Sequence, residues 1–396
     1  MNDARIANER SGRSALTAAS GCGRAGALRA LSAEPVLPVP VALFTWGFDY
    51  LWRIAGLEPW QLACGDHATW HRAYIALLDR HQPDLLWYSG AGDSANPPRL
   101  VEEDREKWVV EDGNGRRCGL RKESLALYDM DTGAKGCDAV GGIATQADAD
   151  RLIPEFTGWG EAYLNGLSRL VGEAGSRALV LPHHSPAYIC ACYAFGFERA
   201  MECMLTEPEL FRYGCDRYAA GDRLRMREWK AAGAEACFIA DGWASCDIIS
   251  PAMVEEFALP YQRSIAEAAR EAGLRIVLWN EGDILPILRQ EAAIPFDAFA
   301  FEQPRKGAAI TVDKVRAAFG PQRCLFGNLD SEMLLLRNDP AEIAAAVREQ
   351  IRQSGAGAPF ILSTGSPLPS NIELESVDAF VRAAREPARV EGRGKS

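Results

Sequence analysis

Three short polar motifs follow apolar runs in the second half of the chain, and they carry the residues best suited to chemistry. They are Asp241-Gly-Trp243, Trp279-Asn-Glu281-Gly282 and Gly327-Asn-Leu-Asp330. The runs before the first two have the composition of buried strands, so a carboxylate should emerge where each strand ends. Two carboxylates in one partly dry cavity push their proton affinities apart, which can supply an acid and a base near neutral pH. We therefore predict catalytic roles for Asp241 and Glu281.

Two adjacent histidines, His183 and His184, end an earlier apolar run. Successive side chains of a strand point to opposite faces, so one imidazole should face the interior of the fold and the other should face away. We predict a catalytic role for His183; the alternative for either residue is a histidine hydrogen-bonded within the rim. Glu281, together with His183 or Asp241, could instead hold a divalent metal ion.

Other polar and aromatic residues stand directly after apolar runs in the same way. An Asp or Ser at such a position often only caps the next helix, and a Trp often only packs there. Convergence of many such side chains on one rim nevertheless favours a binding site. The residues that we expect to contact a substrate are Trp46, Phe48, Tyr88, His184, Trp243, Asn280, Glu302, Asn328, Asp330 and Ser366.

The elements that must position these residues are short apolar runs alternating with helical patterns, which is typical of β/α units and a parallel sheet. A doubly wound open sheet would show the same alternation, but no glycine-rich phosphate fingerprint follows the first run. Eight strands make a TIM-type (β/α)8 barrel, whose active sites lie at the carboxyl ends of the strands. We predict strands at 41–46, 84–88, 178–181, 236–240, 275–279, 298–301, 324–326 and 360–362, within one barrel domain over residues 38–386.

Three segments depart from this alternation. Residues 1–37 are rich in Ala, Gly, Arg and Ser without an apolar period, which predicts a flexible leader, and residues 387–396 are expected to form a flexible tail. Residues 107–115, which end in Asp112-Gly-Asn-Gly115, predict a hairpin inserted at the barrel rim.

Composition excludes several classes of protein. The net charge of -11 argues against a nucleic-acid scaffold, because such a protein needs a basic stripe to neutralise phosphates. No apolar run approaches the roughly 20 residues of a membrane-spanning helix, and the first residues lack the apolar core of a secretory signal, so we expect a cytoplasmic protein. The 11 cysteines are scattered through apolar segments, which suits reduced thiols.

From Phe197 onward the sequence resembles the uroporphyrinogen decarboxylase superfamily, which includes decarboxylases and methylcobamide-dependent methyltransferases. The resemblance covers about residues 38–386 and implies the same (β/α) barrel, with its site in a deep cleft at the carboxyl-terminal rim. Its landmarks are Phe197-Glu-Arg-Ala-Met-Glu202 with Thr206-Glu-Pro-Glu209, Gly233-Ala-Glu-Ala-Cys-Phe-Ile-Ala-Asp-Gly-Trp243, Ile249-Ser-Pro-Ala-Met-Val-Glu-Glu-Phe257 with Pro260-Tyr261, and Phe326-Gly-Asn-Leu-Asp330.

The chain departs from both branches of this superfamily at the expected site. The resemblance implies an arginine-rich segment after the first strand in a true uroporphyrinogen decarboxylase, but only Arg53 is present there, together with Asp49. It implies a zinc site of the form His-x-Cys-Gly with a later Cys in a methyltransferase, but Trp279, Glu281 and Ser366 stand at those positions. Tryptophan cannot ligate zinc, so the standard zinc site is not intact.

We expect a methyltransferase that acts on a small methylated organic substrate, such as an amine or ether, with a corrinoid held by a partner protein. An acidic, Trp-rich site would favour a cationic or aromatic molecule. The alternatives are a decarboxylase of a tetrapyrrole or other small carboxylate, in which Asp241 or Glu281 protonates the carbanion, and a ligand-binding barrel without catalysis. A homodimer is left open.

Overall fold

The computed structural model describes residues 22–45, 49–89, 98–112, 115–130, 142–305 and 309–386. The barrel strands are β1 (Val41–Ala42), β2 (Leu85–Tyr88), β7 (Leu179–His184), β8 (Ala236–Ala240), β9 (Arg275–Asn280), β10 (Ala298–Phe301), β11 (Cys324–Phe326) and β12 (Phe360–Ser363). They close into a parallel barrel in the order β1-β12-β11-β10-β9-β8-β7-β2. Each of the eight predicted strands overlaps an observed one, so the predicted (β/α)8 fold is confirmed.

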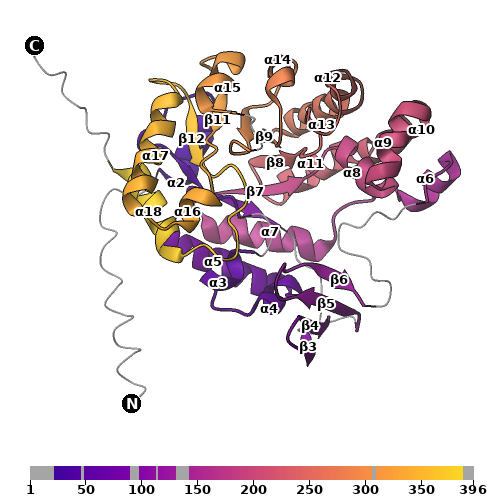
Figure 1. Cartoon of the computed structure of the whole chain (residues 1–396), viewed down its shortest axis with the longest axis horizontal. Helices are drawn as coiled ribbons and strands as arrows, with labels where there is room; N and C mark the ends of the chain where they lie inside the picture. Colours follow the sequence, from indigo (N-terminus) through magenta and orange to yellow (C-terminus); the bar gives the residue numbers. More distant parts are fainter. Residues whose placement is uncertain are drawn as a thin grey trace, which may run out of the picture.

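Helices lie outside the barrel and connect its strands (Figure 1). Among the described residues, no helix is long and apolar enough to cross a bilayer. In the first half of the chain the helices are α2 (Gly23–Leu31), α3 (Leu51–Ile54), α4 (Pro59–Ala63), α5 (His67–His81), α6 (Gln146–Leu152), α7 (Glu161–Ala174), α8 (Ala187–Phe195) and α9 (Phe197–Thr206). The second half contributes α10 (Pro208–Ala219), α11 (Asp222–Ala231), α12 (Pro251–Met253), η2 (Val254–Ala258), α13 (Leu259–Ala272), η3 (Leu285–Ile287), α14 (Leu288–Ala292), α15 (Val312–Phe319), α16 (Met333–Leu336), α17 (Pro340–Gln353) and α18 (Leu374–Arg385).

Side chains alternate between the barrel lumen and the helix layer along each strand. The lumen is filled by four aromatic rings that contact one another: Phe44 stacks on Trp87 with ring centroids 5.1 Å apart, and Phe238 and Trp279 meet Phe44 edge-on at 5.5 Å. This packing makes the lumen a core rather than a channel.

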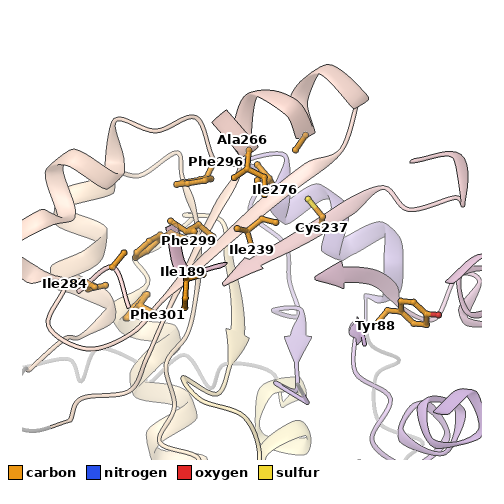
Figure 2. Close-up of a cluster of buried hydrophobic side chains, with 14 of the residues drawn as sticks. Tyr88, Ile189, Cys237, Ile239, Ala266, Ile276, Ile284, Phe296, Phe299 and Phe301 are labelled. Atoms are coloured by element: carbon orange, nitrogen blue, oxygen red, sulfur yellow. The ribbon is translucent and has the colours of Figure 1, made fainter. Parts of the chain in front are cut away.

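The helix-facing sides of the strands form a second and larger core. Figure 2 shows Cys237, Ile239, Ile276 and Phe299 from β8, β9 and β10 in this layer, together with Ala266 from α13. Apart from Arg275 at the start of β9, the residues of these three strands are therefore buried on one side or the other, as is typical of parallel sheets.

The predicted hairpin belongs to a larger insertion, an antiparallel sheet of four strands. Its strands are β3 (Arg99–Glu103), β4 (Lys107–Glu111), β5 (Arg117–Arg121) and β6 (Leu127–Asp129). Trp108, Val110 and Leu120 form its small core and pack against Trp60 of α4. The flanking strands escaped prediction because β3 is mostly exposed and charged, so it carries no alternating apolar pattern.

The expectation of a flexible leader differs from the structure at residues 23–31, which form α2. Ala27, Ala30 and Leu31 are buried against lumen residues such as Leu179, so α2 covers the amino-terminal end of the barrel. The carboxylate of Asp84 accepts hydrogen bonds from the backbone of Gly23 at 2.6 Å and of Val41 at 2.8 Å, which joins α2 to the sheet. Small alanines suffice for close packing there but give no strong apolar stripe in the sequence. Residues 1–21 and the predicted tail at 387–396 lie outside the described residues.

Candidate functional site

The mouth of the barrel, meaning the carboxyl ends of the strands and the loops that follow them, holds only part of the predicted catalytic set. Asp241 follows Ala240, whose side chain faces the lumen, so Asp241 points the other way, into the helix layer. Its Oδ2 accepts a hydrogen bond of 2.8 Å from Gln262 of α13, and the residue is 0% exposed. Burial raises the pKa of Asp241 to about 7. This placement differs from the predicted catalytic role, because a substrate in the mouth would not reach this carboxyl group.

Asn280, predicted to contact a substrate, also points into the helix layer. Its Nδ2 donates to the carbonyl of Ala244 at 2.9 Å and to Oε1 of Glu291 at 2.7 Å, while its Oδ1 accepts from the backbone of Glu281 at 2.8 Å. Asn280 and Glu291 are both 0% exposed, and burial raises the pKa of Glu291 to about 8. The side chain of Asn280 thus lies outside the mouth and hydrogen-bonds to the segments that surround it.

Glu281 is the predicted catalytic residue that the strand alternation turns toward the mouth. Its carboxylate lies across Gly242, because a Cβ built on Gly242 would come within 2.5 Å of Oε1 of Glu281. The next residue, Gly282, has φ of +72°, a left-handed conformation that favours glycine, and its backbone donates to Glu302 at 3.1 Å. The chain turns sharply here and presents Glu281 at the end of β9.

Glu302 adds a second carboxylate to the mouth, on the neighbouring strand. Arg305 forms an ion pair with it at 2.7 Å, and the hydroxyl of Ser366 donates to it at 3.3 Å. Arg305 also pairs with Glu332 at 2.6 Å, so one guanidinium serves two carboxylates. The predicted binding residues Glu302 and Ser366 are therefore in contact with each other, and the described part of the mouth is acidic.

The two histidines divide between the two sides of the sheet, as the strand alternation predicted. His183 continues the lumen-facing positions of β7 and lies 3.2 Å from the carbonyl of Tyr88, while His184 faces the helix layer, edge-on to Trp159. Burial lowers the pKa of His183 to about 4 and that of His184 to about 3. Both imidazoles are therefore neutral at pH 7, and of the two only His183 lies on the lumen side of the sheet.

Four other residues that were predicted to bind a substrate instead make contacts within the protein. The hydroxyl of Tyr88 donates to the carbonyl of Tyr163 at 3.0 Å, in the layer between β2 and helices α5 and α7. Trp243 packs edge-on against Tyr193 and Phe197 on the outer rim. The remaining two carry out local hydrogen bonding: Asn328 donates to the carbonyls of Glu302 and Ile310, and Asp330 caps the backbone of Glu332 and Met333. Trp46 and Phe48 lie outside the described residues.

The zinc site implied by the resemblance to methyltransferases does not fit these residues. The indole nitrogen of Trp279 donates to the carbonyl of Gly365 at 3.0 Å inside the packed lumen, and an indole has no lone pair for a metal. Within the described ranges, no three His, Cys, Asp or Glu side chains are grouped so that they could hold a metal ion. Zinc chemistry of the methyltransferase kind therefore does not fit this mouth, and a metal at Glu281 stays a prediction.

Sequence reasoning missed the residues that support the mouth. Arg305 follows Glu302 by three residues, a spacing that could have suggested the pair. Glu291 and Gln262 gave no signal, because a polar residue on an amphipathic helix normally faces solvent. Two cavities of about 430 and 400 Å³ lie at the opposite, amino-terminal end, where they adjoin Gly23 and Leu31 of α2, and hold no predicted site residue.

Comparison with known proteins agrees with this architecture. A uroporphyrinogen decarboxylase from Anaeromyxobacter dehalogenans is 26% identical over 248 residues, 61% of this chain and 68% of the relative. A methylated-thiol–coenzyme M methyltransferase from Methanosarcina mazei is 25% identical over 238 residues, 59% of this chain and 60% of the relative. The solved structure of a methyltransferase from Methanosarcina mazei superposes with a TM-score of 0.69 at 19% identity, over 92% of this chain and 98% of that one, which shows the shared fold.

The family described as Uroporphyrinogen decarboxylase (URO-D) matches residues 143–387. The match spans β7 to β12 and includes the strand ends that carry His183, Glu281 and Glu302. Because it covers more than half of the sequence, the chain belongs to the uroporphyrinogen decarboxylase family.

Proposed function

We propose that the protein transfers a methyl group between a small methylated organic molecule and a corrinoid carried by a partner protein. The observation that carries the proposal is the acidic mouth. In it the carboxylate of Glu281 lies against the backbone of Gly242, and Glu302 directly follows the neighbouring strand β10. The similarity to a methylated-thiol–coenzyme M methyltransferase supports the reaction class. A corrinoid, when brought by its partner, would supply the metal-centred acceptor or donor of the methyl group.

The acidic mouth favours a cationic substrate, such as a methylated amine. A carboxylate close to a quaternary or protonated nitrogen stabilises the positive charge, and the low dielectric of a partly buried site strengthens this attraction. When such an amine gives up its methyl group as a cation equivalent, it leaves as a neutral molecule. In this proposal Glu281 binds and orients the cation, and neutral His183 faces the same lumen end.

Decarboxylation of a polycarboxylate has less support. Its substrate would need cationic partners, yet Arg53 donates to the carbonyls of Ser370 and Ile372. Arg305 is already paired with two glutamates. Asp241, the alternative proton donor, is buried behind the mouth. A ligand-binding barrel without catalysis would share the acidic mouth but would produce no methylated product.

The test is a spectroscopic assay with chemically reduced cobalamin and a panel of methylated amines, ethers and thiols. The proposal expects the visible spectrum of methylcobalamin to appear with one substrate class, and it expects Glu281→Gln to slow that change by about 100-fold, the low end for removing a group that stabilises charge at the reacting centre. Asp241→Asn serves as the matched control, since it neutralises a carboxyl group outside the mouth.

Each alternative has its own outcome in the same assay. No spectral change across the panel, or a Glu281→Gln variant with full activity, would overturn the proposal. Release of carbon dioxide from a carboxylate substrate would establish the decarboxylase instead. Saturable binding of an amine with no change to it would establish the non-catalytic barrel.

A further inference from the structure

One buried side chain, Asn280, joins three parts of the protein directly behind the mouth. Its amide nitrogen donates to Ala244 in the loop after β8 and to Glu291 on α14, at 2.9 and 2.7 Å. Its amide oxygen accepts from the backbone of Glu281 at 2.8 Å. The residue that precedes Glu281 therefore uses both ends of its side chain within the protein.

The two acceptors determine which way the amide of Asn280 is turned. A flipped amide would place its oxygen against the carbonyl of Ala244, which can only accept, and would lose that hydrogen bond; the contact with Glu291 would survive only with the carboxyl proton on Oε1. The backbone N–H of Glu281 would then face an NH2 group and lose this hydrogen bond at a partly buried position, which is costly. The carbonyl of Ala244, with Oε1 of Glu291 as the second acceptor, therefore keeps the amide oxygen of Asn280 directed at Glu281.

Glu291 is suited to this role as a neutral group. It is 0% exposed, and its second carboxyl oxygen, Oε2, has no hydrogen-bond partner. An ionised carboxylate at such a place would lack the donors that it needs, whereas a protonated one still offers Oε1 to Asn280. The raised pKa of Glu291 agrees with the neutral form at pH 7.

The backbone next to Glu281 makes room for its carboxylate. Gly282 turns the chain at φ of +72° and is held by Glu302, and Gly242 leaves room that a Cβ would fill. The loops after β8 and β9 are also joined by a hydrogen bond of 2.8 Å from the backbone of Cys246 to that of Asp283. The peptide between residues 280 and 281 is held on both sides: its carbonyl accepts from the backbone N–H of Glu302 at 3.1 Å, and its N–H donates to the side chain of Asn280.

We propose that Asn280 is a positioning residue for Glu281, and that Glu291 acts through Asn280 by holding its amide in the required orientation. The inference rests on the proposed function, in which Glu281 binds a methylated cation. A hydrogen bond that only joins β9 to α14 would stabilise the fold without controlling the position of Glu281. Measurements on Glu281 itself distinguish this structural role from the positioning role.

The experiment compares four variants of the full chain: Asn280→Leu, Glu291→Leu, Glu291→Gln and Asn328→Leu. The first two remove the tie, whereas Glu291→Gln retains an oxygen that can accept from Asn280. Asn328→Leu is the matched control, since Asn328 is another buried strand-end asparagine, 4% exposed, that donates to the carbonyls of Glu302 and Ile310, so its replacement leaves the hydrogen bonds between Asn280, Glu281 and Glu291 in place. Residue-resolved hydrogen exchange at the Glu281 amide and calorimetric affinity for tetramethylammonium are measured for each.

We expect about tenfold faster exchange at Glu281 and about tenfold weaker tetramethylammonium binding in Asn280→Leu and Glu291→Leu, with Glu291→Gln close to the parent protein. Asn328→Leu should lower the thermal midpoint and leave both readouts at Glu281 unchanged. Unchanged exchange in Glu291→Leu, or an equal loss in Asn328→Leu, would overturn the inference. If the parent protein fails to bind tetramethylammonium while the exchange pattern holds, the cationic substrate is refuted and the positioning of Glu281 stands.

Discussion

Replacing Asp241 with asparagine should make the protein more stable, and increasingly so as the pH rises. Asp241 is buried, and its ordinary pKa of 3.8 is raised to about 7 in the folded chain by burial. Between these values the folded chain keeps a proton that the unfolded chain has lost, so stability falls as the pH rises through this window. Each pH unit costs about 1.4 kcal/mol, which amounts to about 4 kcal/mol by pH 8.

Asparagine keeps an oxygen for Gln262, which donates to Asp241 at 2.8 Å, and it cannot ionise. Urea unfolding should find Asp241→Asn more stable than the parent protein by about 2 kcal/mol at pH 5.5 and about 4 kcal/mol at pH 8, with no difference near pH 4. Glu209→Gln, at a side chain 85% exposed, is the control and should leave the pH slope unchanged. A variant less stable than the parent at pH 8 would show that Asp241 is a stabilised, ionised carboxylate and would refute this reasoning.

Three further outcomes follow from the packing and the charges. Trp279→Ala should cost about 3 to 5 kcal/mol in urea unfolding, because it empties part of the aromatic lumen; a loss below about 1 kcal/mol would contradict that packing. Burial lowers the pKa of His183 to about 4, so this residue should not titrate near neutral pH. The affinity for substrate should therefore have the same pH dependence between pH 6 and 7 in the parent protein and in His183→Gln. Deleting residues 1–36 removes α2 and exposes the apolar amino-terminal end of the barrel, so it should lower the thermal midpoint. Deleting residues 1–21 retains this helix and serves as the control.

The sequence alone was enough to predict the barrel and the region of its site. Eight apolar runs separated by helical patterns require a parallel sheet, and the motif that contains Glu281 stands where one of its strands ends. Capping and turn residues are local signals, so they can be read without knowing the neighbours of a segment. The small alanines of α2 gave no such signal, and the helix became apparent only from what it covers.

The directions of the strand-end side chains were decided by the tertiary structure. Both faces of β8 and β9 are buried, so their runs of apolar residues contain no alternation that would show which face is the lumen. A change of one residue in register exchanges the two faces, and it would have exchanged Asn280 with Glu281. Sequence placed Asp241 and Glu281 at two neighbouring strand ends; closure of the barrel and packing of α13 and α14 buried the first behind the mouth and presented the second within it.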